Sequence, residues 1–210
     1  RSHRVKALEE LGKTLGRTKS QVANAVAAAE RNQARFQEKL LARGREILEE
    51  MVLGERAIVV VGRAYNSCDP GSNLEIPKKL NKMGIRCIPM DFLPLDSVKL
   101  PDDWKNMYWR YGQKILSACE IVAEDARLYP LYLTNFGCGP DSFIHKFFRD
   151  RLGNKPCLMI EVDEHSADAG MITRCEAFID SLQNANGRAS GGRHFRPLNI
   201  ESGNHRTVLV

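Results

Sequence analysis

One cysteine stands in an unusual setting, in the stretch NFGCGPDS of residues 135–142. Cys138 lies between two glycines and two residues before Pro140, where a strand is expected to become a helix. Flanking glycines let the backbone approach a bulky ligand, and the start of a helix favours a thiolate. The pattern indicates a nucleophile, a redox thiol or an iron ligand, and the alternative is a plain strand-to-helix turn.

Further polar residues in the loops are candidates for binding. In the same stretch, the residues expected to help hold a ligand are Asn135, Gly137, Gly139, Asp141 and Ser142. Arg63, Tyr65 and Asn66, in GRAYNSCDPGSN, are expected to hold an anion or a polar ligand, although this loop lacks the G-K-[ST] ending of a P-loop. Glu164 and His165 suggest acid–base chemistry or a ligand pair, and the alternative is a helix-entry loop that caps backbone groups.

The other five cysteines are scattered along the chain and form no CxxC pair, so the spacing does not indicate a zinc ribbon or finger. Cys68 shares a polar loop with Arg63 and is either a second functional thiol or a spectator. The remaining four stand in predicted strands or helices and are expected to be small core residues: Cys87, Cys119, Cys157 and Cys175.

The elements that position these loops alternate between strands and helices. Apolar runs predict strands over residues 57–62, 85–92, 128–136 and 155–163. Helical periodicity and terminal signals predict helices over residues 74–84, 102–124, 140–153 and 169–185. Such alternation predicts an α/β fold, a flavodoxin-like parallel sheet of four strands in the order 2-1-3-4. Loops 62–73, 91–97, 135–142 and 163–170 then share one edge of the sheet.

The chain divides into three parts. Residues 1–55 are an N-terminal helical segment, with helices over 4–15 and about 19–52, and Thr18 with Gln21 forms a capping-box pattern. We expect the long helix to dock through its apolar stripe from Val22 to Met51, or to pack against a second copy and form a homodimer. Residues 56–185 form the α/β lobe, and residues 186–210 read as a linker and the start of a further element. We interpret the sequence as a piece of a longer polypeptide.

Charge and hydropathy narrow the function classes. The net charge is +5, and the basic excess falls in the two end segments, so the lobe does not suggest a nucleic-acid-binding face. No apolar run is long enough to cross a membrane, and no signal-peptide pattern opens the chain. Scattered cysteines without a secretion signal favour free thiols in a reducing compartment, which we expect to be the cytoplasm.

Five stretches together resemble a known family: GRAYNSCDPGSNLEIPKKL, GIRCIPMDFLPL, NMYWRYGQKIL, YLTNFGCGPDSFI and EVDEHSADAGMITRCEAFIDSL. They are similar to the dehydratase-related region of the acyl-CoA dehydratase activase-related proteins of anaerobic bacteria, which are related to 2-hydroxyacyl-CoA dehydratase and its activator. The resemblance covers about residues 56–185 and is weaker over the N-terminal helices.

The resemblance implies a role in low-potential electron transfer. In this family an ATPase module with an iron–sulfur cluster drives electrons into a dehydratase-like component built of flavodoxin-like lobes. Residues 135–142 match the family motif, so Cys138 is implied as a ligand of a [4Fe-4S] cluster whose other cysteines lie outside this chain. Cys68 departs from the family pattern. The implied partners are other domains of the same polypeptide, including the ATPase activase module, and no ATPase motif occurs in this chain.

Two other functions remain open from the residues. The same loops suit a small-ligand domain that binds a CoA-like or nucleotide phosphate group. The stretch LEELGKTLGRTKSQVANAV resembles a helix-turn-helix and suggests a DNA-associated regulator, although its second helix is longer than a usual recognition helix.

Overall fold

The computed structural model describes residues 2–104, 106–135, 138–163 and 168–184. Its four strands are β1 (Ala57–Val61), β2 (Arg86–Pro89), β3 (Leu128–Asn135) and β4 (Leu158–Val162). Its α-helices are α1 (Ser2–Thr14), α2 (Lys19–Glu50), α3 (Ala64–Cys68), α4 (Ile76–Lys82), α5 (Arg110–Glu124), α6 (Gly139–Leu152) and α7 (Asp168–Asn184). Three short 3-10 helices are η1 (Met90–Phe92), η2 (Leu95–Ser97) and η3 (Asp102–Trp104).

The strands form one parallel sheet in the order β2-β1-β3-β4, which confirms the predicted α/β fold and strand order. In the register, Val61 of β1 pairs with Tyr132 of β3, and Asn135 at the end of β3 pairs with Val162 of β4. Because the strands are parallel, their carboxyl ends meet at one edge of the sheet. The loops after β1, β2 and β3 therefore lie on one edge, as predicted.

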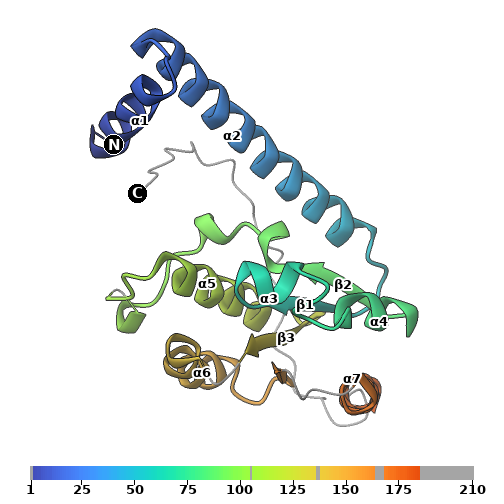
Figure 1. Ribbon diagram of the computed structural model, residues 1–210. Helices are drawn as coiled ribbons and strands as arrows, with labels where there is room; N and C mark the ends of the chain where they lie inside the picture. The colour runs from blue at the N-terminus through green and yellow to red at the C-terminus, as the bar shows by residue number, and fades with distance from the viewer. Residues whose placement is uncertain (1, 105, 136–137, 164–167, 185–210) are drawn as a thin grey trace.

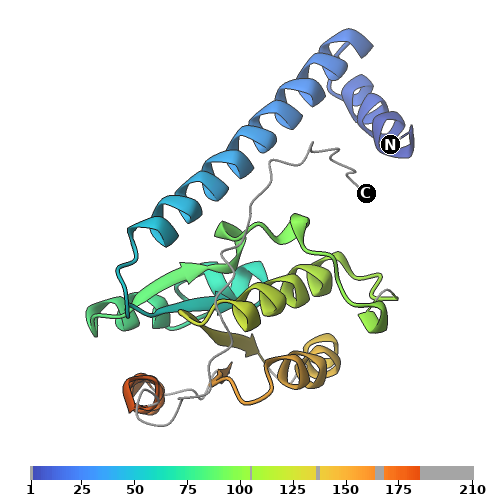
Figure 2. The same ribbon diagram turned by 180° about the vertical axis from the view of Figure 1, so that it is seen from behind.

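Helices cover both faces of the sheet (Figures 1 and 2). Val59 and Val61 of β1 face α5, α6 and the C-terminal end of α2, whereas Ile58 and Val60 face α4 and α7. Every residue of β1 is buried, which explains its continuous run of apolar, mostly β-branched side chains. Two apolar layers of core residues thus hold the sheet between helices.

The long helix α2 extends away from the lobe, with α1 folded back along its far end (Figure 1). The predicted capping box starts it: the Gln21 amide donates to Thr18 Oγ1 at 3.2 Å, and the Thr18 amide donates to Gln21 Oε1 at 2.9 Å. Its C-terminal turns dock on the lobe, where Gly44 and Ile47 are buried. A Cβ atom at Gly44 would lie 1.9 Å from the backbone oxygen of Phe92, so only glycine permits this close approach.

Three predicted elements differ from the structure. The helix predicted over 102–124 is split into η3 and α5, because Met107 and Trp109 fold back onto Gly112 and Gln113 Nε2 donates to the Met107 carbonyl at 2.6 Å. The predicted loop 62–73 contains the short helix α3. The strand predicted over 85–92 ends at Pro89 and turns into η1.

Candidate functional site

The carboxyl ends of β1 and β3 form the centre of the candidate site. Gly62 follows β1, and a Cβ atom there would lie 2.5 Å from the carbonyl oxygen of Leu133 in β3. Glycine therefore lets the segment after β1 leave the sheet directly beside β3. This close approach brings Arg63 and α3 next to the start of α6, which follows β3.

A buried ionic network joins the two loops. Asp141, in the first turn of α6, is 1% exposed, and its Oδ2 lies 3.0 Å from Nη2 of Arg63. Thr134 Oγ1 donates to Asp141 Oδ2 at 2.6 Å, and the hydroxyl of Tyr132 donates to Oδ1 at 3.4 Å. A buried carboxylate needs such partners, and the helix N-terminus adds favourable electrostatics. Two residues predicted from separate loops are thus brought together.

The aromatic side chains around this network are fixed by packing. The Arg63 guanidinium lies over the ring of Tyr65, 4.8 Å from its centroid. The ring of Tyr132 makes edge-to-face contacts with His145 and Phe148. Burial and then the negative charge of Asp141 raise the pKa of Tyr132, so its hydroxyl stays protonated and donates to Asp141. Tyr65 is 50% exposed, so the cluster faces solvent on the side of this ring.

Cys138 occupies the N-cap position of α6, as the sequence predicted. Its backbone amide donates to Asn135 O at 3.2 Å, and its carbonyl accepts from the Ser142 amide at 2.9 Å and from Ser142 Oγ at 3.1 Å. The backbone caps the helix, and the thiol makes no capping hydrogen bond. The half-buried thiol at this helix N-terminus is therefore available to bind a metal or to react.

Two predicted binding residues fasten the loops to the sheet. Asn66 Nδ2 donates to Leu133 O at 3.3 Å, and Asn135 Nδ2 donates to Val162 O at 3.0 Å. Within the described part of the chain, three buried polar atoms here have no hydrogen-bond partner: Arg63 Nε, Asn66 Oδ1 and Asn135 Oδ1. Buried polar atoms are normally paired, so these atoms indicate water or ligand atoms at this edge.

The other cysteines divide into two groups. Burial raises the pKa of Cys87, Cys119 and Cys157 to about 12, and it also raises the pKa of Cys175. Cys119 and Cys175 are buried core residues, as predicted, whereas Cys87 and Cys157 are half-buried at the border of the core. Cys157 directly precedes β4 instead of lying inside it. Burial therefore makes these four thiols less reactive than an accessible thiol.

Cys68 is exposed at the C-terminal end of α3, and its Sγ lies 3.5 Å from Ser67 Oγ. It borders a second polar cluster, in which Lys114 Nζ lies 3.2 Å from Asp91 Oδ1. Burial, then the charges of Asp91 and Cys68, raise the pKa of Tyr111 in this cluster. Cys68 therefore lies near Tyr111, whereas Cys138 lies in the same helix turn as Asp141.

Some site residues were missed, and others fall outside the described residues. Thr134 and Tyr132 were not predicted, although a threonine inside an otherwise apolar strand is a signal for a buried polar contact. Gly137, Glu164 and His165 lie outside the residues that the structure describes. Gly139 leaves open space around its Cα, and Ser142 is exposed.

The donor set for a metal is incomplete in the described part of the chain. No group of three or more His, Cys, Asp or Glu side chains there is arranged to hold a metal ion. Cys138 fits as one thiolate ligand, since its thiol has no capping role and lies at a helix N-terminus.

Among the described residues, no helix is long and apolar enough to cross a membrane.

A pocket with a volume of about 570 Å³ lies beside α6 and β4. Its lining is largely charged and includes Lys146, Arg149 and Arg174 together with Asp150 and Glu161. Arg174 Nη2 donates to the Met159 carbonyl at 2.6 Å, and the lining also includes His145, whose buried Nε2 has no hydrogen-bond partner among the described residues. The pocket is thus polar and weakly basic.

The N-terminal part of the chain matches a known protein family. Residues 1–93 match the family model described as the CoA enzyme activase uncharacterised domain. The match confirms the resemblance to acyl-CoA dehydratase activase-related proteins over this part of the chain. It includes the N-terminal helices, for which the sequence had suggested a weaker resemblance, and it ends before β3 and Cys138. No curated protein and no solved structure matches the chain.

Proposed function

We propose that this activase-related module contributes one thiolate, Cys138, to an iron–sulfur cluster and does not catalyse a reaction by itself. The observation that supports this role is the position of Cys138: a half-buried thiol without a capping bond, at the N-terminus of α6 and on the functional edge of the sheet. Iron–sulfur clusters are held by several cysteine thiolates. The other ligands of a [4Fe-4S] cluster then come from other parts of the protein or from its partner domains.

In this proposal, the residues around Cys138 hold its thiol in position as one ligand of the cluster. The Arg63–Asp141 pair fixes the first turn of α6 to the segment after β1, so the thiol is held at a fixed place on the sheet edge. The positive end of the α6 dipole is a favourable place for the negative charge of an iron–sulfur cluster. When bound, the cluster supplies one-electron redox chemistry at this edge.

The experiment compares the complete protein with two serine variants after anaerobic reconstitution with iron and sulfide. Cys138→Ser is expected to lose most of the bound iron and sulfide and the visible absorbance of the cluster. Cys68→Ser is the matched control, because it changes the exposed cysteine of the neighbouring loop, and it is expected to keep both. Circular dichroism confirms that each variant is folded. Iron content that is unchanged in folded Cys138→Ser protein refutes the proposal.

The basic pocket beside α6 supports a second candidate function, the binding of a phosphate-bearing small molecule such as CoA or ADP. Arg149 and Arg174 bring positive charge to this pocket of about 570 Å³, a size typical of ligand pockets, whereas the charge of Lys146 is paired with Asp150. Titration with CoA and ADP at two salt concentrations tests it. Saturable binding that weakens in Arg149→Ala supports the candidate, and absence of saturable binding excludes it.

A further inference from the structure

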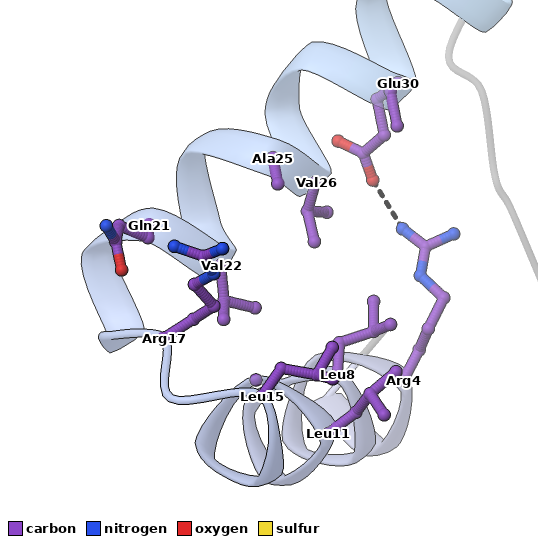
Figure 3. Close-up of a pocket in the computed structure, with 12 residues that line it drawn as sticks. Arg4, Leu8, Leu11, Leu15, Arg17, Gln21, Val22, Ala25, Val26 and Glu30 are labelled. Atoms are coloured by element: carbon purple, nitrogen blue, oxygen red, sulfur yellow. Dashed lines mark hydrogen bonds and ion pairs between the residues drawn. The ribbon is translucent and has the colours of Figure 1, made fainter.

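An apolar groove opens between the two N-terminal helices, with a volume of about 650 Å³ (Figure 3). Leu8, Leu11 and Leu15 of α1 face Val22 and Val26 of α2 across it. The helices cross closely near Gly12, where a Cβ atom would lie 2.2 Å from Val22 Cγ2. The groove is open to solvent: two of the side chains that line it, Leu11 and Leu15, are 54% and 64% exposed.

Charged and polar side chains stand only at the ends of this groove. Arg4 and Glu30 form an ion pair at one end, and Arg17 and Gln21 stand at the other (Figure 3). Between them the lining is apolar, which includes the small side chains of Ala25 and Ala29. The groove therefore suits an apolar side chain flanked by a helix, not a charged ligand.

The apolar stripe of α2 continues past the groove, and none of the residues that the structure describes covers it there. Residues 31–39 are all exposed, and Phe36 is 54% exposed on the same stripe as Val22 and Val26. Within the part of the chain that the structure describes, the helix reaches the lobe at its C-terminal turns, and its middle stands clear of the sheet and its helices (Figures 1 and 2). A long helix gains most of its stability from packing of such a stripe, so an uncovered one indicates an interface.

We propose that a second copy of this chain covers the stripe, with the two α2 helices packed antiparallel. The stripe residues are Val22, Val26, Ala29, Gln33, Phe36 and Leu40. Their spacing alternates between four and three residues, the pattern of helices that pack side by side. A two-fold axis near Arg31 places Phe36 of each copy against Val26 of the other, and Leu40 against Val22.

This arrangement is complementary in size and introduces no unpaired charge. Phe36, a large exposed side chain, enters the groove where Ala25 and Ala29 leave room, and the two-fold axis makes the same contact twice. By helical spacing, Arg31 and Arg35 point away from the stripe. Glu30, at the edge of the stripe, is already paired with Arg4.

The size of the face sets the expected strength of the pair. At about 1.5 Å per residue the stripe from Val22 to Leu40 is about 27 Å long and about 10 Å wide, and α1 adds a second helix width only beside the part from Val22 to Glu30. Each copy then contributes about 400 Å², which gives about 800 Å² in total, the size of a weak interface. The interface is therefore expected to be weak and to respond to a single substitution at its centre.

The test measures the molar mass of the full chain by sedimentation equilibrium at micromolar concentrations. Wild-type protein is expected to be a dimer, and Phe36→Glu is expected to be a monomer, because two carboxylates would be forced into the apolar groove. Phe143→Glu is the matched control, since Phe143 is also an exposed helical phenylalanine, 77% exposed on α6, and this variant is expected to stay dimeric. Wild-type protein that is monomeric, or a dimer that persists in Phe36→Glu, overturns the proposal.

Discussion

Nη2 of Arg63 and Oδ2 of Asp141 lie 3.0 Å apart at the edge of the sheet where β1 and β3 end. Arg63 follows β1, and Asp141 starts α6 after β3, so this pair connects two loops that are distant in sequence. The thiol of Cys138, at the N-cap of α6, is positioned by the same helix turn. The pair is therefore the structural link between the fold and the candidate ligand.

Removing the charge of Asp141 is predicted to destabilise the fold strongly. Asp141→Asn leaves the Arg63 guanidinium without its carboxylate in a largely buried site, which typically costs about 3 kcal/mol or more. Urea unfolding measures the change. Asp150→Asn on the same helix is the matched control, because its partner Lys146 and its own side chain are exposed, and about 0.5 kcal/mol or less is expected there. Equal small losses in both variants would contradict the structural role of the pair.

A methyl group at Gly44 is predicted to displace α2 from the lobe. Gly44→Ala would place a Cβ atom 1.9 Å from Phe92 O, and a backbone atom cannot move aside as a flexible side chain does. A loss of about 1–3 kcal/mol in unfolding free energy is expected, as for overpacked cores. Gly170→Ala in α7, where nothing lies within 4 Å, is the control and is expected to be neutral or to stabilise by up to about 1 kcal/mol. The docking account fails if the two variants behave alike.

Lys155 is predicted to give the protein a stability that rises with pH in the alkaline range. Its ammonium donates to the Val122 and Asp125 carbonyls, and burial lowers its pKa from 10.5 to about 8, with Asp125 acting in the opposite direction. Between about pH 8 and 10.5 the unfolded chain therefore holds a proton that the folded protein has lost. The unfolding free energy rises with pH across this window.

The measurement compares unfolding free energies at pH 8 and pH 10 in wild type and Lys155→Met. The difference between the two pH values should be smaller, or more negative, in the variant, because the variant lacks the group with the lowered pKa. Lys146→Met, which changes an exposed lysine, should retain the wild-type pH dependence. An identical pH dependence in Lys155→Met would show that this lysine titrates normally in the folded protein.

The sequence alone predicted the sheet and the position of one site residue, Cys138. Continuous apolar runs and intervening helices predicted four parallel strands and their order, and glycines with Pro140 located Cys138 at the start of α6. These signals are local, so a single sequence carries them. The capping box of Thr18 and Gln21 was predictable for the same reason.

The contacts between loops were not predictable, because they depend on distances across the sheet. No local signal marks the pairing of the Arg63 guanidinium with Asp141 or the hydrogen bond from the Asn66 amide to Leu133 O. Nothing local marks Leu74 and Glu75, whose positive φ values of 51° and 53° bend the chain into α4. The break before α5 also escaped prediction, since Met107 and Trp109 fold onto Gly112 through tertiary contacts.

The central claim, that Cys138 is a cluster ligand, is tested most directly by iodoacetamide alkylation mapped by peptide mass in the complete protein, reconstituted anaerobically with iron and sulfide. A thiolate bound to iron cannot be alkylated, so Cys138 is expected to resist labelling until the iron is removed by a chelator and then to be labelled faster than buried Cys119. Cys68, exposed on the neighbouring loop, is the internal control and should be labelled in both states. Labelling of Cys138 at the same rate before and after iron removal would contradict the claim.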